Sequence, residues 1–434
     1  MNAGTPLALE RLDAARAEAG LPAPDGAARE ALARVFDASP FAAEVLCADP
    51  ALADAATGPW LHDAAPPADR WRPAAWPAAD DAEAMRLLRR FRRAESARLV
   101  VRDVLGVDAV RATIEGATAL AETCIEQALR HLEPGFHARH GTPRRADGDV
   151  QRMVVVGMGK LGGGELNFSS DIDLVFAYAE PGTCEGGRGL DFEDFYARLG
   201  QRLAQLLGET TADGFCYRVD LRLRPFGSVG RMALSFAAME HYYQREGRDW
   251  ERYAWIKARP VAGDIEGGRR LLAALSPFVY RRYLDFTAID GLREMKRLID
   301  AEVARKDLAN HVKLGPGGIR ELEFMLQLVQ LVRGGREPGL RTPSYYAAMD
   351  AAVAAGHAPP DVAASLREAY EFLRRVENRI QMRHDAQAHE LPDDAAERGA
   401  LARGLGYPDW AACDAALGAR RARVAAAFAE LLAP

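Results

Sequence analysis

The sequence lacks the features of a secreted protein, a membrane-spanning protein or a zinc-finger protein. Its five cysteines are scattered along 434 residues and form no Cys-x-x-Cys pair, which argues against a disulfide framework and a zinc site. No run of about 18 apolar residues is present, so we expect no membrane span. The N-terminus contains Glu10, Arg11 and Asp13 and lacks an apolar signal region. These absences favour a cytoplasmic protein.

The sequence also lacks an excess of positive charge. Its 62 acidic and 56 basic residues give a formal net charge of -6, which argues against a nucleic-acid-binding surface over the whole molecule. Local basic clusters can still hold phosphates. The phosphate-binding pattern Gly-x-x-x-x-Gly-Lys-Ser/Thr is absent, because Lys160 precedes the main glycine cluster and is followed by Leu161. This absence argues against a P-loop kinase.

Hydrophobic periodicity divides the chain into three parts. Apolar residues recur at helical spacing over 28–52 and 82–132, and the Pro-rich stretch 59–77 between them predicts a loop. The abrupt change to the apolar run 153–156 predicts a buried strand and places a domain boundary near 145. We expect an N-terminal helical region (1–145), a middle core domain (146–285) and a C-terminal helical bundle (286–434).

The middle part mixes strands with one helix, which predicts an α+β fold. We expect strands at 153–156, 172–178, 215–223 and 231–235, and a helix at 192–207. From Phe236 onward almost every segment has a helical pattern, with breaks at 263–268, 315–318, 334–343 and 391–394.

The segment 157–176 contains the strongest functional pattern, a Gly-rich turn followed by Asp-x-Asp at the start of a strand. Because side chains alternate along a strand, Asp171 and Asp173 should share one face while Ile172, Leu174 and Phe176 face the core. Two carboxylates would then point to one place. Mg²⁺ and Mn²⁺ prefer such oxygen ligands, and a pair of ions can assist phosphoryl transfer.

A third carboxylate is expected from the predicted strand 215–223. There Asp220 alternates with apolar residues and shares its face with Arg218, Arg222 and Arg224. Guanidinium groups bind phosphate oxygens in pairs, so this face suits a polyphosphate. The full candidate site comprises Asp171, Asp173 and Asp220 as catalytic and metal-binding residues, and Gly159, Lys160, Gly162, Ser169, Ser170, Arg218, Arg222 and Arg224 as phosphate- or nucleotide-binding residues.

Each half of this pattern also has a simpler interpretation. Asp-x-Asp after serine is common in turns and helix caps, and Gly-x-Gly-x-x-Gly alone occurs in dinucleotide sites and ordinary loops. A dinucleotide site, however, requires a helix directly after the glycines and an acid roughly 20 residues later. Here Ser-Asp-x-Asp and a second strand follow within about a dozen residues. The whole pattern therefore favours a metal site.

Residues 157–176, Gly-Met-Gly-Lys-Leu-Gly-Gly-Gly-Glu-Leu-Asn-Phe-Ser-Ser-Asp-Ile-Asp-Leu-Val-Phe, closely resemble the nucleotidyltransferase motif of bacterial glutamine synthetase adenylyltransferase/adenylyl-removing enzymes. The resemblance continues through Asp220-Leu-Arg-Leu-Arg-Pro-Phe-Gly, Gly247-Arg-Asp-Trp-Glu-Arg-Tyr-Ala, Lys257-Ala-Arg and Lys313-Leu-Gly-Pro-Gly-Gly-Ile-Arg-Glu-Leu-Glu-Phe. It implies a core similar to DNA polymerase β, with a mixed sheet carrying the acids. Gly159-Lys160 stands where the wider superfamily has Gly-Ser, and the lysine could hold a phosphate.

The resemblance also implies a reaction. Family members carry two such domains in tandem, whereas this chain has one, so we expect a separated half that begins at Met1. The amino-acid sequence of residues 163–173 resembles that of the N-terminal, adenylyl-removing copy. This implies phosphorolysis: orthophosphate attacks an AMP esterified to a glutamine synthetase tyrosine and releases ADP. The adenylylating half, which uses ATP, and a catalytically silent regulatory module are the alternatives. The implied cofactor is two Mg²⁺ or Mn²⁺ ions, and the implied effectors are the PII signal protein and glutamine.

Two other features have more than one interpretation. The Gly-rich turn and helix start at 313–323 could bind an anion or dock the helical bundle, and Arg320, Glu321 and Glu323 could face the cleft. Two arginine clusters are expected to be solvated helix faces. They comprise Arg89, Arg90, Arg92 and Arg93, and Arg374, Arg375 and Arg379.

Overall fold

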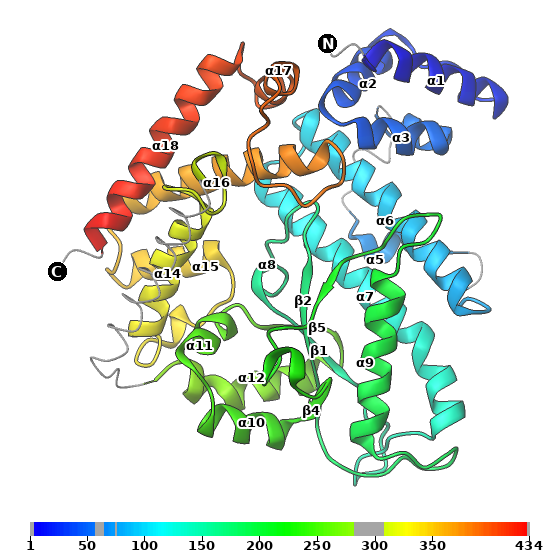
Figure 1. The fold of residues 1–434 in the computed structure, drawn as a ribbon, viewed down its shortest axis with the longest axis vertical. Coiled ribbons are helices and arrows are strands. Elements are labelled where there is room, and N and C mark those ends of the chain that lie inside the picture. Colours follow the sequence, from blue (N-terminus) through cyan, green and yellow to red (C-terminus); the bar gives the residue numbers. More distant parts are fainter. Residues whose placement is uncertain (1–3, 57–64, 74–75, 282–307, 432–434) are drawn as a thin grey trace.

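The computed structural model describes residues 4–56, 65–73, 76–281 and 308–431. A central sheet is surrounded by helices (Figure 1), and the expected α+β class is confirmed. The N-terminal helical elements are α1 (Gly4–Glu18), α2 (Gly26–Ala38), α3 (Pro40–Ala48), η1 (Pro50–Ala56), α5 (Pro67–Arg70), α6 (Asp81–Val104) and α7 (Val110–His140). None of the described helices is both long enough and apolar enough to cross a membrane.

In the described part of the chain, five strands form one mixed sheet. They are β1 (Val154–Gly157), β2 (Ile172–Tyr178), β3 (Val219–Asp220), β4 (Ala233–Ser235) and β5 (Arg259–Gly263). The order is β3-β2-β1-β5, and β4 also pairs with β2. β1 is antiparallel to β2 and β5, whereas β2 is parallel to β3 and β4. The mixed sheet expected from the sequence is therefore confirmed.

The remaining helices follow or interrupt the strands. They are α8 (Gly159–Gly162), α9 (Phe192–Gly208), η2 (Gly227–Val229), α10 (Phe236–Arg245), α11 (Asp249–Trp255), α12 (Ile265–Val279), η3 (Leu308–Asn310), α14 (Ile319–Arg333), η4 (Pro338–Leu340), α15 (Tyr345–Ala354), α16 (Pro360–Met382), α17 (Ala395–Gly404) and α18 (Trp410–Leu431). Short polar side chains begin helices in both the N-terminal region and the rest of the chain: Asp25 (α2), Ser39 (α3), Asp80 (α6) and Asp264 (α12) each accept a hydrogen bond from a backbone N–H of the first turn.

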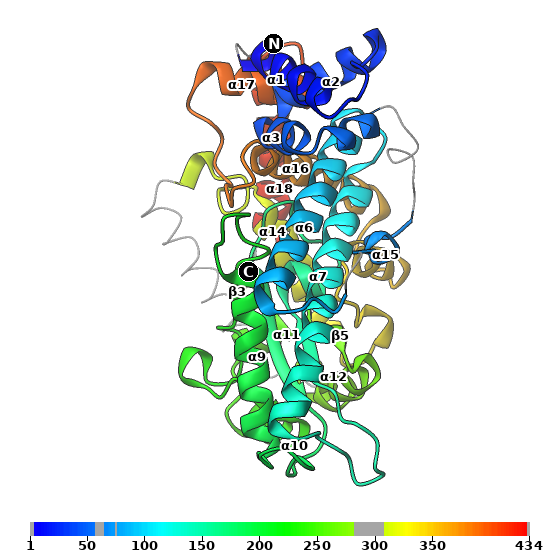
Figure 2. The same ribbon diagram turned by 90° about the vertical axis from the view of Figure 1, so that its right-hand side faces the viewer.

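The two faces of the sheet belong to two apolar cores. Ile172, Leu174 and Phe176 of β2 pack in a core with the N-terminal helices, α7 and α9, as the alternation predicted. Val175 and Ala177 point the other way, into a core with α10, α12, α14 and α16. Figure 2 shows the same arrangement from the side, with α7 and α9 running along the sheet. Asp173 precedes Val175 by two residues and therefore lies toward the second core.

The local secondary-structure predictions were correct in part. Strands at 153–156, 172–178 and 231–235 and the helix at 192–207 are confirmed to within a few residues. Of the strand predicted over 215–223, only Val219–Asp220 forms: residues 215–218 are not in a strand, and the chain turns after Asp220. Strand β5 was missed: a short segment containing Pro260 carries a weak strand pattern. The predicted boundary near 145 stays a prediction, and the one at 285/286 lies outside the described residues.

The break predicted at 263–268 is also shorter than expected. Gly267 and Gly268 lie inside α12, which begins at Ile265. A Cβ on Gly268 would stand 2.6 Å from the Cβ of Pro260, so glycine here lets the helix approach strand β5 closely.

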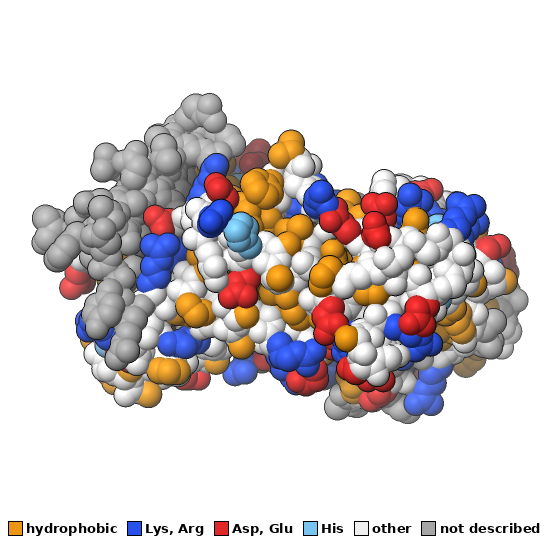
Figure 3. Space-filling model, turned by 90° about the horizontal axis from the view of Figure 1, so that it is seen from below, with side chains coloured by type: hydrophobic (Ala, Val, Ile, Leu, Met, Phe, Trp, Pro, Cys, Tyr) orange, Lys and Arg blue, Asp and Glu red, His pale blue; other side chains and the backbone are white. Residues whose placement is uncertain are grey.

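Several arginines of the two clusters are buried, which corrects the expectation of solvated helix faces for them, whereas Arg90 and Arg375 are exposed as expected. Arg89, Arg92 and Arg374 are among the largest fully buried side chains, and Arg379 is buried as well. Arg89 on α6 donates to the carbonyl oxygens of Leu206 (3.3 Å) and Gly214 (2.9 Å) and also to that of Glu209. A buried arginine can thus satisfy the free carbonyls at a helix end, which the charge pattern alone cannot show. On the described part of the face in Figure 3, acidic and basic side chains are interspersed.

Replacing Arg89 by Met should destabilise the protein by about 2–4 kcal/mol, because the carbonyls at the end of α9 lose their donors. The matched control is Arg90→Met on the next residue of α6, whose side chain is exposed and lies 3.7 Å from Asp213. This variant should change the free energy of unfolding by less than about 0.5 kcal/mol. Urea unfolding of both variants measures the difference, and equal effects would contradict the bridging role.

Candidate nucleotidyl-transfer site

Two aspartates lie side by side on neighbouring parallel strands. Asp173 on β2 is paired with Asp220 on β3 in the sheet register. The position of Asp173 is fixed further by its backbone oxygen, which accepts a hydrogen bond from the backbone N–H of Met158 at 2.9 Å. The sheet therefore sets the separation of the two carboxylates, as the sequence pattern predicted for the third acid.

The two carboxylates have opposite pKa shifts. Burial raises the pKa of Asp173 to about 6, and the negative charges of Asp220 and Asp171 add to this effect. The pKa of Asp220 is lowered, because the Arg222 side chain hydrogen-bonds its carboxylate against a smaller effect of burial. Asp173 is thus the carboxylate whose charge is poorly compensated, and a cation placed beside it would relieve the repulsion.

Asp171 is partnered by a nearby arginine. The Nε of Arg218 donates to the Asp171 Oδ1 at 2.6 Å, and its Nη2 is 3.4 Å from the Ser169 hydroxyl. Ser169 is buried, whereas Ser170 is partly exposed next to Asp171. The structure therefore brings the predicted Asp171, Ser169 and Arg218 into direct contact.

These residues fit a divalent cation by the chemistry of their donors. Asp173 and Asp220 offer adjacent carboxylate oxygens of the kind that Mg²⁺ and Mn²⁺ prefer. Within the described ranges, however, no group of three or more His, Cys, Asp or Glu side chains is arranged as a ready metal cluster. Asp171 and Asp220 are each hydrogen-bonded to an arginine, and these bonds would have to open for a third ligand to join.

The glycines of the turn are required by close contacts. Gly159 has a φ of +54°, and a Cβ there would lie 2.9 Å from the Oδ2 of Asp173. A Cβ on Gly162 would lie 1.8 Å from the carbonyl oxygen of Lys257. The carbonyl oxygen of Gly162 accepts a hydrogen bond from Arg259 at 3.0 Å. Gly159 thus borders the aspartate site, while Gly162 closes the packing of α8 against the segment before β5.

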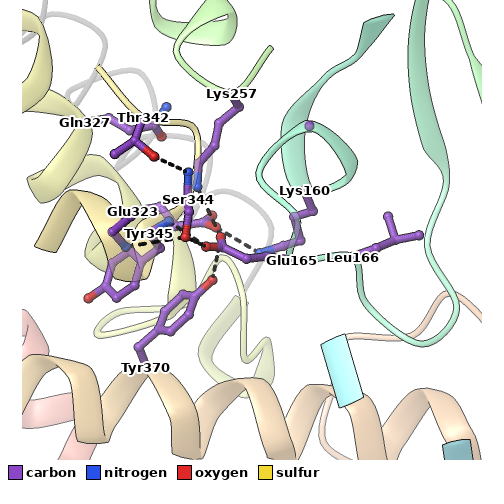
Figure 4. A network of polar contacts seen from close by, with 12 residues as sticks. Lys160, Glu165, Leu166, Lys257, Glu323, Gln327, Thr342, Ser344, Tyr345 and Tyr370 are labelled. Atoms are coloured by element: carbon purple, nitrogen blue, oxygen red, sulfur yellow. Dashed lines mark hydrogen bonds and ion pairs between the residues drawn. The ribbon is translucent and has the colours of Figure 1, made fainter. Parts of the chain in front are cut away.

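Lys160 on α8 forms an ion pair with Glu323 of α14 at 3.0 Å (Figure 4). Burial and the positive charge of Arg374 lower the pKa of Lys160 to about 8, although Glu323 opposes this shift. Burial alone would raise the pKa of Glu323, but Lys160 and Lys257 lower it to about 2. Glu323 was named from the sequence only as a residue that could face the cleft, and the structure shows it at the site.

The loop 165–169 is held by buried polar side chains. Glu165 accepts hydrogen bonds from the Ser344 hydroxyl (3.1 Å), the Tyr345 N–H (2.5 Å) and the Tyr370 hydroxyl (3.3 Å), and it pairs with Lys257 (Figure 4). All of these partners except Lys257 belong to the C-terminal helical part of the chain.

Helix α16 supplies most of the remaining bonds to this loop. Arg374 donates to the carbonyl oxygen of Glu165 and to the Asn167 side chain, both at 2.6 Å. The backbone N–H of Phe168 donates to Asn378 at 3.1 Å, and that of Ser169 donates to Gln381 at 2.9 Å. Because Asp171 and Asp173 follow this loop directly, α16 helps to set where they lie. The sequence pattern did not identify these residues as part of the site.

Arg222 and Arg224 do not share the strand face that was predicted for them. The backbone N–H and the Nε of Arg222 both donate to the Asp220 carboxylate, at 2.8 Å each, because the chain turns directly after β3. Arg224 instead donates to the carbonyl oxygens of Leu221 (2.8 Å), Ser228 (2.8 Å) and Gly230 (3.1 Å). Its guanidinium stabilises its own loop, and its phosphate-binding role stays a prediction.

Lys313 is a further cation that the sequence analysis did not select as a site residue. Its positive charge lowers the pKa values of both Asp173 and Lys160, which places its side chain near both. Lys313 makes no ion pair with the described residues. The backbone N–H groups of Lys313 and Leu314 donate to the ring nitrogen of His311, which fixes this turn. An anion near Asp173 would therefore find two lysines, Lys160 and Lys313.

Sequence comparisons identify the family to which this site belongs. The family model described as glutamate-ammonia ligase adenylyltransferase matches residues 29–274, more than half of the chain. The chain belongs to this family. A second model, described as PII-uridylyltransferase, matches residues 293–432.

Curated relatives of this family are named bifunctional glutamine synthetase adenylyltransferase/adenylyl-removing enzyme. The protein of Xanthomonas axonopodis pv. citri is 58% identical over 412 residues, which cover 95% of this chain and 43% of the relative. That of Stenotrophomonas maltophilia R551-3 is 57% identical over 404 residues, 93% of this chain and 42% of the relative. That of Hahella chejuensis is 49% identical over 350 residues, 80% of this chain and 36% of the relative. The chain thus spans less than half the length of these relatives.

Replacing Asp173 by Asn should stabilise the protein when a chelator removes divalent ions. The folded-state pKa of about 6 lies above the ordinary 3.8, so the folded protein loses stability as the pH rises through this range, and the loss is complete above about pH 6. At pH 7.5 the substitution should therefore raise the free energy of unfolding by about 1–3 kcal/mol.

Asp220→Asn is the matched control, because hydrogen bonds from Arg222 lower the pKa of Asp220 and stabilise its charged form. This variant should give no gain in stability at pH 7.5. Denaturant unfolding at pH 4 and pH 7.5 measures both variants. A destabilised Asp173→Asn protein at pH 7.5 would contradict the repulsion between the carboxylates.

Proposed function

We propose that this chain catalyses the phosphorolytic removal of AMP from an adenylylated tyrosine of glutamine synthetase. An orthophosphate oxygen attacks the AMP phosphorus, the bond to the tyrosine oxygen breaks, and this oxygen takes up a proton as ADP leaves. The observation that carries the proposal is the pair of adjacent aspartates, Asp173 and Asp220, facing a cluster of cations. This arrangement suits transfer of a charged phosphoryl group between two oxygens.

The side chains around the aspartates have distinct roles in this proposal. Divalent Mg²⁺ or Mn²⁺ ions, held by Asp173, Asp220 and Asp171, would supply charge neutralisation at the reacting phosphorus. Lys160 and Lys313 bind the incoming orthophosphate as point charges, since both lie near Asp173. Arg218 and Arg222 bind oxygens of the AMP phosphate when their bonds to Asp171 and Asp220 open. Gly159 leaves room beside Asp173.

Two features support the direction of the reaction: the amino-acid sequence of the motif and the lysines near Asp173. Residues 163–173 are similar to the adenylyl-removing copy of the family motif. Removal requires a binding site for free orthophosphate as well as for AMP. Lys313, which forms no ion pair with any residue that the structure describes and lies near Lys160, supports such a site. The adenylylating reaction, in which ATP donates AMP and pyrophosphate leaves, is the second candidate, because the relatives are named for both activities.

The same resemblance supports partners for this reaction. We propose adenylylated glutamine synthetase as the protein substrate, in keeping with the name of the relatives. The match of residues 293–432 to a PII-uridylyltransferase model supports the PII signal protein as a regulator, with glutamine as a further effector. We place the reaction in the cytoplasm, where glutamine synthetase and its nucleotides are present.

A two-way assay tests the direction. The chain is incubated with adenylylated glutamine synthetase, Mg²⁺ and orthophosphate, and in parallel with the unmodified synthetase, Mg²⁺ and ATP. We expect ADP and unmodified tyrosine in the first reaction. Pyrophosphate in the second reaction without ADP in the first would identify the adenylylating activity instead. Asp173→Asn should reduce ADP release below detection, because the carboxylate next to the reacting phosphorus is lost.

Glu323→Gln should shift the alkaline limb of the pH–rate profile to lower pH by about one unit, because Glu323 raises the pKa of Lys160 against burial. Lys160 then loses its proton below pH 8 and binds orthophosphate less well. Glu321→Gln is the matched control on the first turn of α14, where the side chain accepts from Gly317 N–H at 3.1 Å. Its alkaline limb should stay in place. The same limb in the Glu323→Gln enzyme as in the wild type would exclude the ion pair as a determinant of Lys160.

A further inference from the structure

A large cavity lies where the N-terminal helices meet the C-terminal helices. None of its lining residues belongs to the aspartate site. The cavity has a volume of about 850 Å³ and is lined by α2, the connection between α6 and α7, α16 and α17. In Figure 1, α17 lies beside α2 above α16. A cavity of this size accommodates a small organic molecule.

Four arginines line this cavity: Arg34, Arg375, Arg379 and Arg403. Arg403 is neutralised by Asp37, with its Nε 3.1 Å from the carboxylate. Arg379 is only 6% exposed, and its Nε lies 2.6 Å from the Oδ1 of Asp103. Its Nη1, however, has no acceptor among the described residues. A buried guanidinium nitrogen without a hydrogen-bond acceptor lowers the stability of the fold, so an anion bound to this nitrogen would stabilise it.

The positive charges of the other two arginines have no acidic partner among the described residues. Arg34 donates only to the carbonyl oxygen of Val104, at 3.3 Å, and Arg375 makes no hydrogen bond or ion pair with the described residues. Both repel Arg379, whose pKa is lowered by burial and then, against the effect of Asp103, by these two charges. Three positive charges are thus held close together.

The acidic residues of the lining cancel only part of this positive charge. Asp37 and Asp103 are paired with Arg403 and Arg379, and Asp108 is paired with Arg102 at 2.6 Å. Among the lining carboxylates only Glu30, which is exposed, makes no ion pair within the described part of the chain. Since Asp103 neutralises Arg379, the charges without an ion pair in the described part of the chain are those of Arg34 and Arg375, whose side chains are exposed. The buried Nη1 of Arg379 adds a donor that has no acceptor there.

We propose that this cavity is a second ligand site, which binds a small anion through a carboxylate or phosphate group held by Arg34, Arg375 and the Nη1 of Arg379. Planar guanidinium groups bind both kinds of anion with paired hydrogen bonds. Binding would compensate the mutual repulsion of the three arginines and join α2 to α16.

Helix α16 connects this cavity to the loop 165–169, which precedes the aspartates. Arg375 and Arg379 line the cavity, whereas Arg374, Asn378 and Gln381 of the same helix bond the loop 165–169. A ligand that holds the cavity side of α16 also holds the side that bears the loop. The anion site is therefore a regulatory site, and its occupancy should stabilise the position of the loop that precedes Asp171 and Asp173.

Titration of the full chain with malonate and with inorganic phosphate at constant ionic strength tests the proposal. Calorimetry should show saturable binding of at least one probe, and the double variant Arg34→Gln/Arg375→Gln should weaken it by about tenfold or more. The matched control is Arg367→Gln, another arginine of α16, which pairs with Asp350 away from the cavity. It should bind as the wild type does.

The two probes distinguish the sources of the anion. Binding of malonate indicates a carboxylate ligand. A phosphate signal that the double variant loses indicates a phosphate ligand of the cavity, because Arg34 and Arg375 line the cavity and not the aspartate site.

Hydrogen exchange supplies a readout that does not depend on the proposed reaction. The backbone N–H groups of Phe168 and Ser169 donate to α16, so the bound probe should slow their exchange in the wild type but not in the double variant. Absence of saturable binding of both probes, or binding that the double variant retains in full, would overturn the proposal. Loss of ADP release with this binding intact would instead count against the proposed function alone.

Discussion

The site depends on one constraint, the burial of a polar loop under helix α16. A loop that follows a short helix would normally lie in water, because its backbone groups need hydrogen-bond partners. Here Thr118, Asn378 and Gln381 accept hydrogen bonds from the backbone N–H groups of residues 166, 168 and 169, and Arg374 donates to a carbonyl oxygen of the same loop. The loop can therefore be both buried and rigid. The strand that bears Asp173 begins from a fixed position.

The same burial creates the electrostatics of the site. Because water is largely excluded, charges act on one another more strongly than they would at the surface. This explains why the pKa values of Asp173 and Lys160 move toward neutrality, to about 6 and about 8. It also explains why Glu323 and Glu377, buried among lysine, arginine and histidine, have pKa values of about 2. Buried charges of both signs therefore lie around Asp173 and Lys160.

The sequence predicted those parts of the site that depend on local pattern. Alternation along β2 placed Asp171 and Asp173 away from the buried Ile172, and this needs no knowledge of the rest of the chain. The pairing of Asp220 with Asp173 was also expected, but the turn after β3 was not. Arg222 and Arg224 consequently have other partners than the alternation implied.

Contacts between distant parts of the chain could not be predicted in this way. Glu323 reaches Lys160 across 163 residues, and no local spacing connects them. The arginines of α6 and α16 were interpreted as solvated because charge usually means exposure. Arg89 and Arg374 are buried because their partners are carbonyl oxygens and side chains contributed by other elements. Only the folded arrangement shows those partners.

The bonds between α16 and the loop 165–169 also bear on how this protein could have evolved. A loop whose backbone is satisfied by side chains more than 200 residues away cannot exchange its helical neighbour for an unrelated one. Substitution of Arg374, Asn378 or Gln381 would leave a buried backbone group unpaired unless the loop changed as well. The strands that bear the aspartates and helix α16 are therefore constrained to change together.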